Sequence, residues 1–71
     1  MKMKIMVIEH NKDLSEARSY YDAVRVEIKW VNEAEWYCWV IHCQDGSTAT
    51  FTCGHCTVYQ WSDIYNLYKE I

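Results

Sequence analysis

The sequence predicts an α+β fold, a two-layer sandwich in which a mainly antiparallel sheet carries a C-terminal helix on one face. Three observations predict it: an alternating run over residues 24–30, a hairpin signal at Asp45-Gly46, and an apolar stripe at helical spacing near the C-terminus. The chain has 71 residues, is 51% apolar and 15% aromatic, and contains no proline. We therefore expect one folded domain, residues 1–71, with the element order β-α-β-β-β-α.

The first half of the chain gives three elements of this order. Residues 4–9 (KIMVIE) read as a strand. Asp13 and Glu16 have the spacing of a helix N-terminus, and apolar residues follow at helical spacing, which predicts a short helix within residues 13–22. Residues 24–30 alternate between apolar and charged side chains, so we expect a strand. Its inward side chains are Val24, Val26, Ile28 and Trp30.

Asp45-Gly46 lies between two β-rich runs and predicts a hairpin with a two-residue type I′ turn. That turn pairs Cys38 with Cys53 and Val40 with Phe51, and alternation then assigns every side chain to a face. The inward set is Trp36, Cys38, Val40, His42, Ala49, Phe51 and Cys53. The outward set is Tyr37, Trp39, Ile41, Cys43, Thr48, Thr50 and Thr52.

The C-terminal segment reads as an amphipathic helix. Thr57 and Gln60 have the spacing of a capping box. An apolar stripe at helical spacing follows, formed by Val58, Trp61, Ile64, Tyr65, Tyr68 and Ile71. We expect this helix to bury Trp30, Trp36 and Phe51 against the sheet.

Composition excludes several classes of function. A net charge of −3 without a basic run argues against direct nucleic-acid binding. No apolar stretch is long enough to span a membrane, and the first ten residues lack a signal-peptide core, so we expect a soluble, cytosolic protein with reduced thiols. The sequence shows no phosphate-binding loop, no catalytic triad pattern and no paired carboxylates in a predictable cleft. We expect neither an enzyme nor a bound cofactor.

Cys53-Gly54-His55-Cys56 supports the alternative function, a Cys-based redox domain or a zinc-stabilised one. The four residues match the CGHC redox motif of protein disulfide isomerases, in which a helix N-terminus would stabilise a thiolate. Thr52 stands where that family has Trp, and the chain lacks the family's cis-proline. A zinc site would take Cys53, His55 and Cys56 with Cys38 or Cys43, but only one C-x₂-C pair is present. Cys38 and Cys53 could also form a cross-strand disulfide; we expect free thiols and no metal.

The outward face of the hairpin is the main candidate for function, because it combines aromatic anchors with a polar rim. The predicted partner-binding residues are Tyr37, Trp39, Ile41, Thr48, Thr50, Thr52, Glu27, Glu35 and Asp45. Two alternatives remain open. The short helix within residues 13–22 could cover this face, or a second copy of the chain could bind it and form a homodimer.

A compact, proline-free domain with a hairpin sheet, one packed helix and no catalytic set resembles the small phage-encoded inhibitor proteins, anti-CRISPR proteins among them. The resemblance implies a viral, non-enzymatic inhibitor that blocks a host complex by stoichiometric binding in the cytoplasm of the infected cell. It further implies a bacterial nucleoprotein complex as partner. The acidic side chains that would meet a basic channel are Glu27, Glu33, Glu35 and Asp45.

Overall fold

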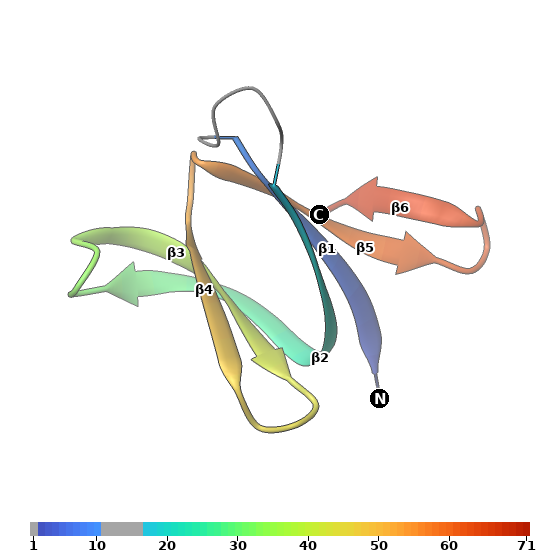
Figure 1. Cartoon of the computed structure of the whole chain (residues 1–71), viewed down its shortest axis with the longest axis horizontal. Coiled ribbons are helices and arrows are strands. Elements are labelled where there is room, and N and C mark those ends of the chain that lie inside the picture. Colours follow the sequence, from blue (N-terminus) through green and yellow to red (C-terminus); the bar gives the residue numbers. More distant parts are fainter. Residues whose placement is uncertain (1, 11–16) are drawn as a thin grey trace.

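The computed structural model describes residues 2–10 and 17–71, and all of the regular structure within them is β-strand. The strands are β1 (Met3–Glu9), β2 (Ala17–Val31), β3 (Trp36–Cys43), β4 (Thr48–Thr52), β5 (Cys56–Ser62) and β6 (Leu67–Glu70). They form one antiparallel sheet in the order β4-β3-β2-β1-β5-β6. The predicted α+β sandwich is therefore wrong, and the described part of the chain is all-β (Figure 1).

A short connection forces this sheet to curl. Three strands separate β4 from β5 in the sheet, which would place them about 19 Å apart if it were flat. Only residues 53–55 join them, and a link of that length spans at most about 14 Å. The Sγ of Cys56 lies 3.6 Å from the carbonyl oxygen of Thr52, so the two strand ends do meet. The sheet closes on itself at this corner.

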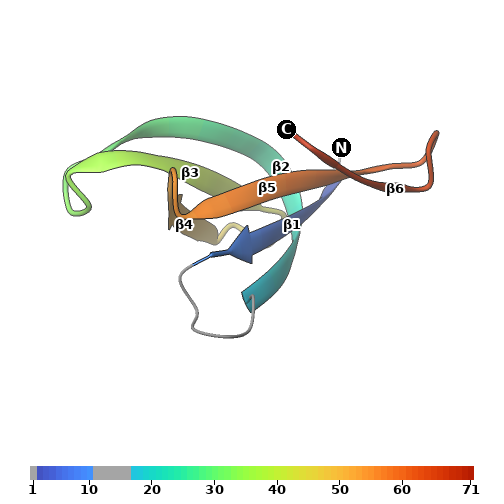
Figure 2. The same ribbon diagram turned by 90° about the horizontal axis from the view of Figure 1, so that it is seen from above.

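The long strand β2 carries the curl, because it belongs to both halves of the sheet. Its N-terminal part pairs with β1 and its C-terminal part with β3. A β-bulge between Ala23 and Arg25 separates the two parts, and bulges bend a strand and increase its twist. In Figures 1 and 2, β2 sweeps from the half containing β1, β5 and β6 to a β2–β3 hairpin at the other end of the molecule.

The curled sheet encloses a small core on its concave side, which we call the inner face. Five side chains there are almost fully buried: Ile5, Val7, Ala23, Ile41 and Val58. The rings of Tyr21 from β2 and Phe51 from β4 meet edge to face, with centroids 5.9 Å apart. Side chains from all of β1 to β5 thus meet without a helix to cover the sheet.

The predicted C-terminal helix is replaced by the β5–β6 hairpin. Trp61, the centre of the predicted stripe, pairs with Tyr68 across the two strands. The β-branched and aromatic residues of this segment favour strands, and β1 offers an unpaired edge for β5. Asn66 adopts a positive φ of 56° in the turn, which a helix would not contain. Trp30 and Trp36, which the helix was expected to bury, are about half exposed.

The predicted short helix is also wrong where it can be compared. Residues 17–22 belong to strand β2 and pair with β1. Asp13 and Glu16, which suggested the helix start, lie outside the described residues. The strand predictions held better, because β1 and the strand at residues 24–30 are confirmed. Val24 is an exception, since the bulge turns it outward and leaves it half exposed.

The Asp45-Gly46 hairpin exists, but its register differs by one residue from the predicted one. Cys38 pairs with Thr52 rather than with Cys53. A type I′ turn needs positive φ at both central residues, and only Gly46 has it, at 92°. The Asp45 carboxylate instead accepts hydrogen bonds from the N–H and hydroxyl of Ser47, at 2.9 and 2.6 Å. The backbone N–H of Cys43 donates to the carbonyl of Ser47, so the loop holds three residues.

That single step inverts the predicted faces of β3 relative to β4. Trp39 and Ile41, predicted outward, lie on the inner face with Ala49 and Phe51. The β2–β3 turn contains the four residues 32–35, so Trp30 pairs with Tyr37.

We expect Ile41→Ala to lower the free energy of unfolding by about 2–5 kcal/mol, because the isoleucine is fully buried where three strands meet. Urea unfolding followed by tryptophan fluorescence measures it. Ile64→Ala, at a side chain that is 88% exposed, should change the value by no more than about 0.5 kcal/mol. Equal effects of the two changes would contradict this description of the core.

Candidate functional site

Like the end of the β5–β6 hairpin, the end of the β2–β3 hairpin carries large exposed apolar side chains, but only the β2–β3 hairpin has an exposed Trp–Tyr ring pair. The strands of the β2–β3 hairpin extend beyond the end of β4, so the inner-face side chains at its tip have no β4 side chains beside them. Three large side chains on the inner face here are 49–53% exposed: Ile28, Trp30 and Tyr37. Trp36 is 54% exposed as well, but it directly precedes Tyr37 in the strand and therefore points to the outer face. We call Ile28, Trp30 and Tyr37 the tip surface. Isolated exposed apolar residues are ordinary, but three together on one face of a hairpin form a candidate binding surface.

Local contacts hold the aromatic rings of the tip surface in place. The rings of Trp30 and Tyr37 are nearly perpendicular, at 82°, with centroids 5.4 Å apart. The indole N–H of Trp30 donates to Oδ1 of Asn32 at 2.9 Å. Because this polar atom is satisfied within the hairpin, a partner could cover the ring without leaving the N–H unpaired.

The same arrangement recurs in the β5–β6 hairpin. Trp61 and Tyr68 meet at 71° with centroids 5.1 Å apart, and the indole N–H of Trp61 donates to Asp63 at 2.9 Å. In both hairpins Trp is followed two residues later by Asn or Asp, five later by a residue with positive φ, and seven later by Tyr. The repeated spacing is readable in the sequence, and our sequence analysis missed it.

The predicted partner-binding residues do not form one surface. Tyr37, Trp39 and Ile41 lie on the inner face, where Tyr37 is exposed, Trp39 is half-buried and Ile41 is fully buried. Thr48, Thr50 and Thr52 lie on the outer face of β4, in register with His42, Val40 and Cys38. Glu27 is on the outer face of β2, and Glu35 and Asp45 are in two different turns.

An ionic cluster occupies the outer face between β2 and β3. Nε2 of His42 lies 2.5 Å from Oε2 of Glu27, and the guanidinium of Arg25 lies 3.4 Å from the same oxygen. Hydrogen bonding to His42 and the positive charges nearby hold the pKa of Glu27 below its usual value. The carboxylate is thus ionised at neutral pH and ties the two strands together.

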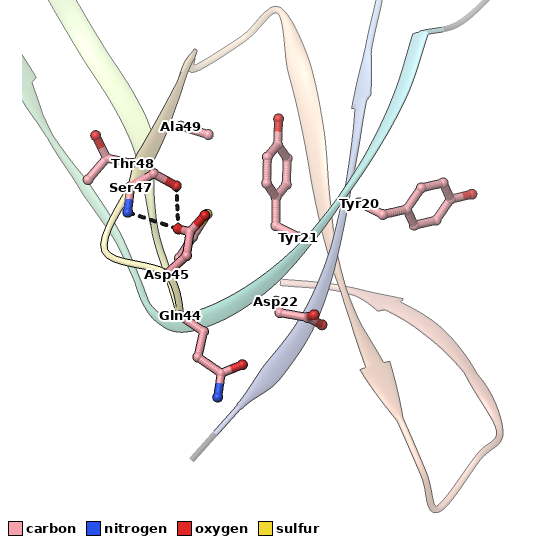
Figure 3. A pocket seen from close by; sticks show the side chains of 9 residues that line it. Tyr20, Tyr21, Asp22, Gln44, Asp45, Ser47, Thr48 and Ala49 are labelled. Atoms are coloured by element: carbon pink, nitrogen blue, oxygen red, sulfur yellow. Dashed lines mark hydrogen bonds between the residues drawn. The ribbon is translucent and has the colours of Figure 1, made fainter.

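A hollow of about 630 Å³ opens between β2 and the β3–β4 turn (Figure 3). In Figure 3 Tyr21 lies on the side of β2 that faces Ala49, whereas Tyr20 points to the other side. The backbone carbonyl of Asp22 accepts from the N–H of Gln44, and the Asp45 carboxylate is held by Ser47. These hydrogen bonds fix the turn, and the Ser47 hydroxyl in the lining donates to the Asp45 carboxylate within that turn.

The cysteines lack the environment of reactive thiols. All four are free, and the one-residue shift of the hairpin removes the predicted pairing of Cys38 with Cys53. Burial, followed by neighbouring acidic groups, raises the pKa of the Cys56 thiol to about 11, and burial raises that of Cys53. The turn after Cys53 leads into a strand, so no helix N-terminus stabilises a thiolate. Within residues 2–10 and 17–71, no three potential ligands converge on a metal position.

Comparison with models of known protein families, with curated protein sequences and with solved structures found no match for this chain. Among the described residues there is no helix with the length and apolar character needed to cross a bilayer.

We expect Glu27→Gln to reduce stability at neutral pH and to reduce it less as the solution becomes acidic. The folded protein lowers the pKa of Glu27, so its contribution is present above the ordinary value of 4.5 and disappears as the pH falls through the folded value. Urea unfolding across the acid range measures the gap between wild type and variant. Glu33→Gln, in the exposed β2–β3 turn, controls for the loss of charge. A gap that stays constant with pH would contradict the role of the cluster.

Alkylation should be slow at Cys56. A pKa of about 11 leaves very little thiolate at mildly alkaline pH, so iodoacetamide should react at least about tenfold more slowly in the folded protein than in urea. Peptide mass spectrometry after timed quenching gives the rate at each cysteine. A folded rate that matches the unfolded one would restore the redox hypothesis.

Proposed function

We propose that this chain is a non-enzymatic protein-binding module that binds its partner through the tip surface. The observation that supports this proposal most directly is the group of three half-exposed apolar side chains on one face of a projecting hairpin. Trp and Tyr dominate the energetics of protein interfaces because they bury much area and lose little conformational freedom. The fixed Trp30–Tyr37 pair would bind without further ordering.

The charges beside the tip surface suggest what the partner carries. Glu33 and Glu35 are exposed in the turn between the two strands, and the chain has a net charge of −3. A complementary partner has an apolar pocket for the rings and basic side chains around it. Blocking of a host complex, as in the anti-CRISPR proteins, is a narrower form of this proposal. Only Glu33 and Glu35 beside the tip surface support this narrower proposal, because the packed helix on which the resemblance was based is replaced by strands.

Ile28→Ser tests the proposal with little risk to the fold. Ile28 is 53% exposed and lies outside the Trp30–Tyr37 ring pair, which truncating Tyr37 would remove. Immobilised wild-type protein is used to capture a partner from a bacterial lysate, mass spectrometry identifies it, and calorimetry with the purified partner gives the affinity. We expect Ile28→Ser to weaken binding about tenfold or more, because it removes an apolar side chain from the tip surface.

Ile64→Ser is the matched control, because Ile64 is 88% exposed at the tip of the other hairpin. It should bind like the wild type, and both variants should melt within a few degrees of it. Equal binding by wild type, control and Ile28→Ser would place the interface elsewhere and overturn the proposal.

A further inference from the structure

Strand β4 leaves one edge of the sheet open. The hydrogen bonds from Cys53 to Tyr37 and from Cys43 to Ser47 fix the phase of the β3–β4 ladder, so Ala49 and Phe51 bond to β3. The backbone N–H and C=O groups of Thr48, Thr50 and Thr52 therefore point away from β3. No strand of the described chain pairs with β4 on that side. The carbonyl of Thr52 accepts from His55, and the outward groups of Thr48 and Thr50 lie at the open edge.

Space lies beside this edge. A hollow of about 300 Å³ borders one end, lined by Glu9, Thr50, Phe51, Thr52, His55 and Cys56. The larger hollow of about 630 Å³ borders the other end, at Thr48 and Ala49. The edge is thus reachable by another strand.

The two free edges of the sheet differ in their protection. Natural proteins discourage edge pairing with charges, prolines or bulges. β6 carries Lys69 and Glu70, whereas β4 reads Thr-Ala-Thr-Phe-Thr and contains no charge, proline or glycine. Such a segment has high β propensity and is suited to pairing with a strand.

The sequence of β4 is complementary to itself. If two copies align antiparallel with Thr50 opposite Thr50, then Thr48 lies opposite Thr52 and Ala49 lies opposite Phe51. All residues with outward backbone groups then face one another, as a hydrogen-bonded ladder requires. Thr–Thr pairs are favourable across strands, and a small residue opposite a large ring avoids a clash. No other antiparallel register of the five residues matches all of them.

We propose that β4 pairs with β4 of a second copy of this chain, giving a two-fold symmetric dimer centred on Thr50. The two curled sheets become one continuous sheet at this edge. The dimer uses the backbone edge of β4 and no side chain of the tip surface, so it does not depend on the proposed function.

Hydrogen exchange of the wild-type protein gives a direct test. The Thr50 amide has no backbone partner among residues 2–10 and 17–71, so it should exchange quickly in a monomer but slowly in the dimer. Sedimentation at the same concentration should give twice the 8.5 kDa mass of one chain. A single-chain mass together with rapid exchange of the Thr50 amide would overturn the proposal.

Thr50→Pro locates the interface. The substitution removes an N–H that no strand in the described part of the chain accepts, and it blocks an incoming strand. The monomer should therefore melt normally while the dimer dissociation constant rises about tenfold or more. Glu70→Pro makes the same change at the other free edge, where the N–H also points outward, and should leave the dimer intact. A dimer that survives Thr50→Pro or is lost with Glu70→Pro would contradict the β4 interface. If Thr50→Pro unfolds the chain, the hydrogen exchange of the Thr50 amide and the sedimentation mass of the wild-type protein still test the dimer.

Discussion

The closure between β4 and β5 is the constraint on which the rest of the structure depends. Because residues 53–55 must join strands at positions one and five of the sheet, the sheet has to curl, and the curl creates the core. The bulge after Ala23 supplies the bend that closure demands. A domain of this size has little core to spare, and a curled sheet lets it bury side chains without a second layer. The end of the β2–β3 hairpin projects beyond the curled part of the sheet, and its apolar side chains are exposed there.

Much of the local structure could be predicted from the sequence, while its faces could not. Alternation located β1, β3 and part of β2, and the Asp45-Gly46 signal located a hairpin. Which side chains of β3 and β4 share a face depends on whether the loop between them has two or three residues. Hydrogen bonds from Ser47 to the Asp45 carboxylate stabilise the three-residue loop. The apolar residues from Val58 to Tyr68 fit a helix equally well by spacing. Pairing with β1, a contact distant in sequence, made that segment a strand.

The candidate site was only partly predictable for the same reason. Tyr37 was identified as an exposed aromatic, but Trp39 and Ile41 were grouped with it although they pack inward. Trp39 and Ile41 pair with residues of β4, whereas β4 ends before it reaches Tyr37. The length of β4, and not the residue type, therefore leaves Tyr37 exposed. The recurring Trp-x-Asx spacing was a better signal. It marks two hairpins that are closed by the same indole hydrogen bond and ring contact, of which only the first leaves its Trp and Tyr about half exposed.

The placement of β5 beside β1 also bears on the order in which the chain can fold. Strands β1 to β4 are neighbours in sequence and can associate as a meander as soon as they are made. Val7 and Ile5 gain their second neighbouring strand only when residues 56–62 arrive. During synthesis the core side of the meander is therefore incomplete until late, with an apolar strand at its edge. Long-range pairing of this kind slows folding, so the nascent chain passes through a stage at which chaperones can bind it.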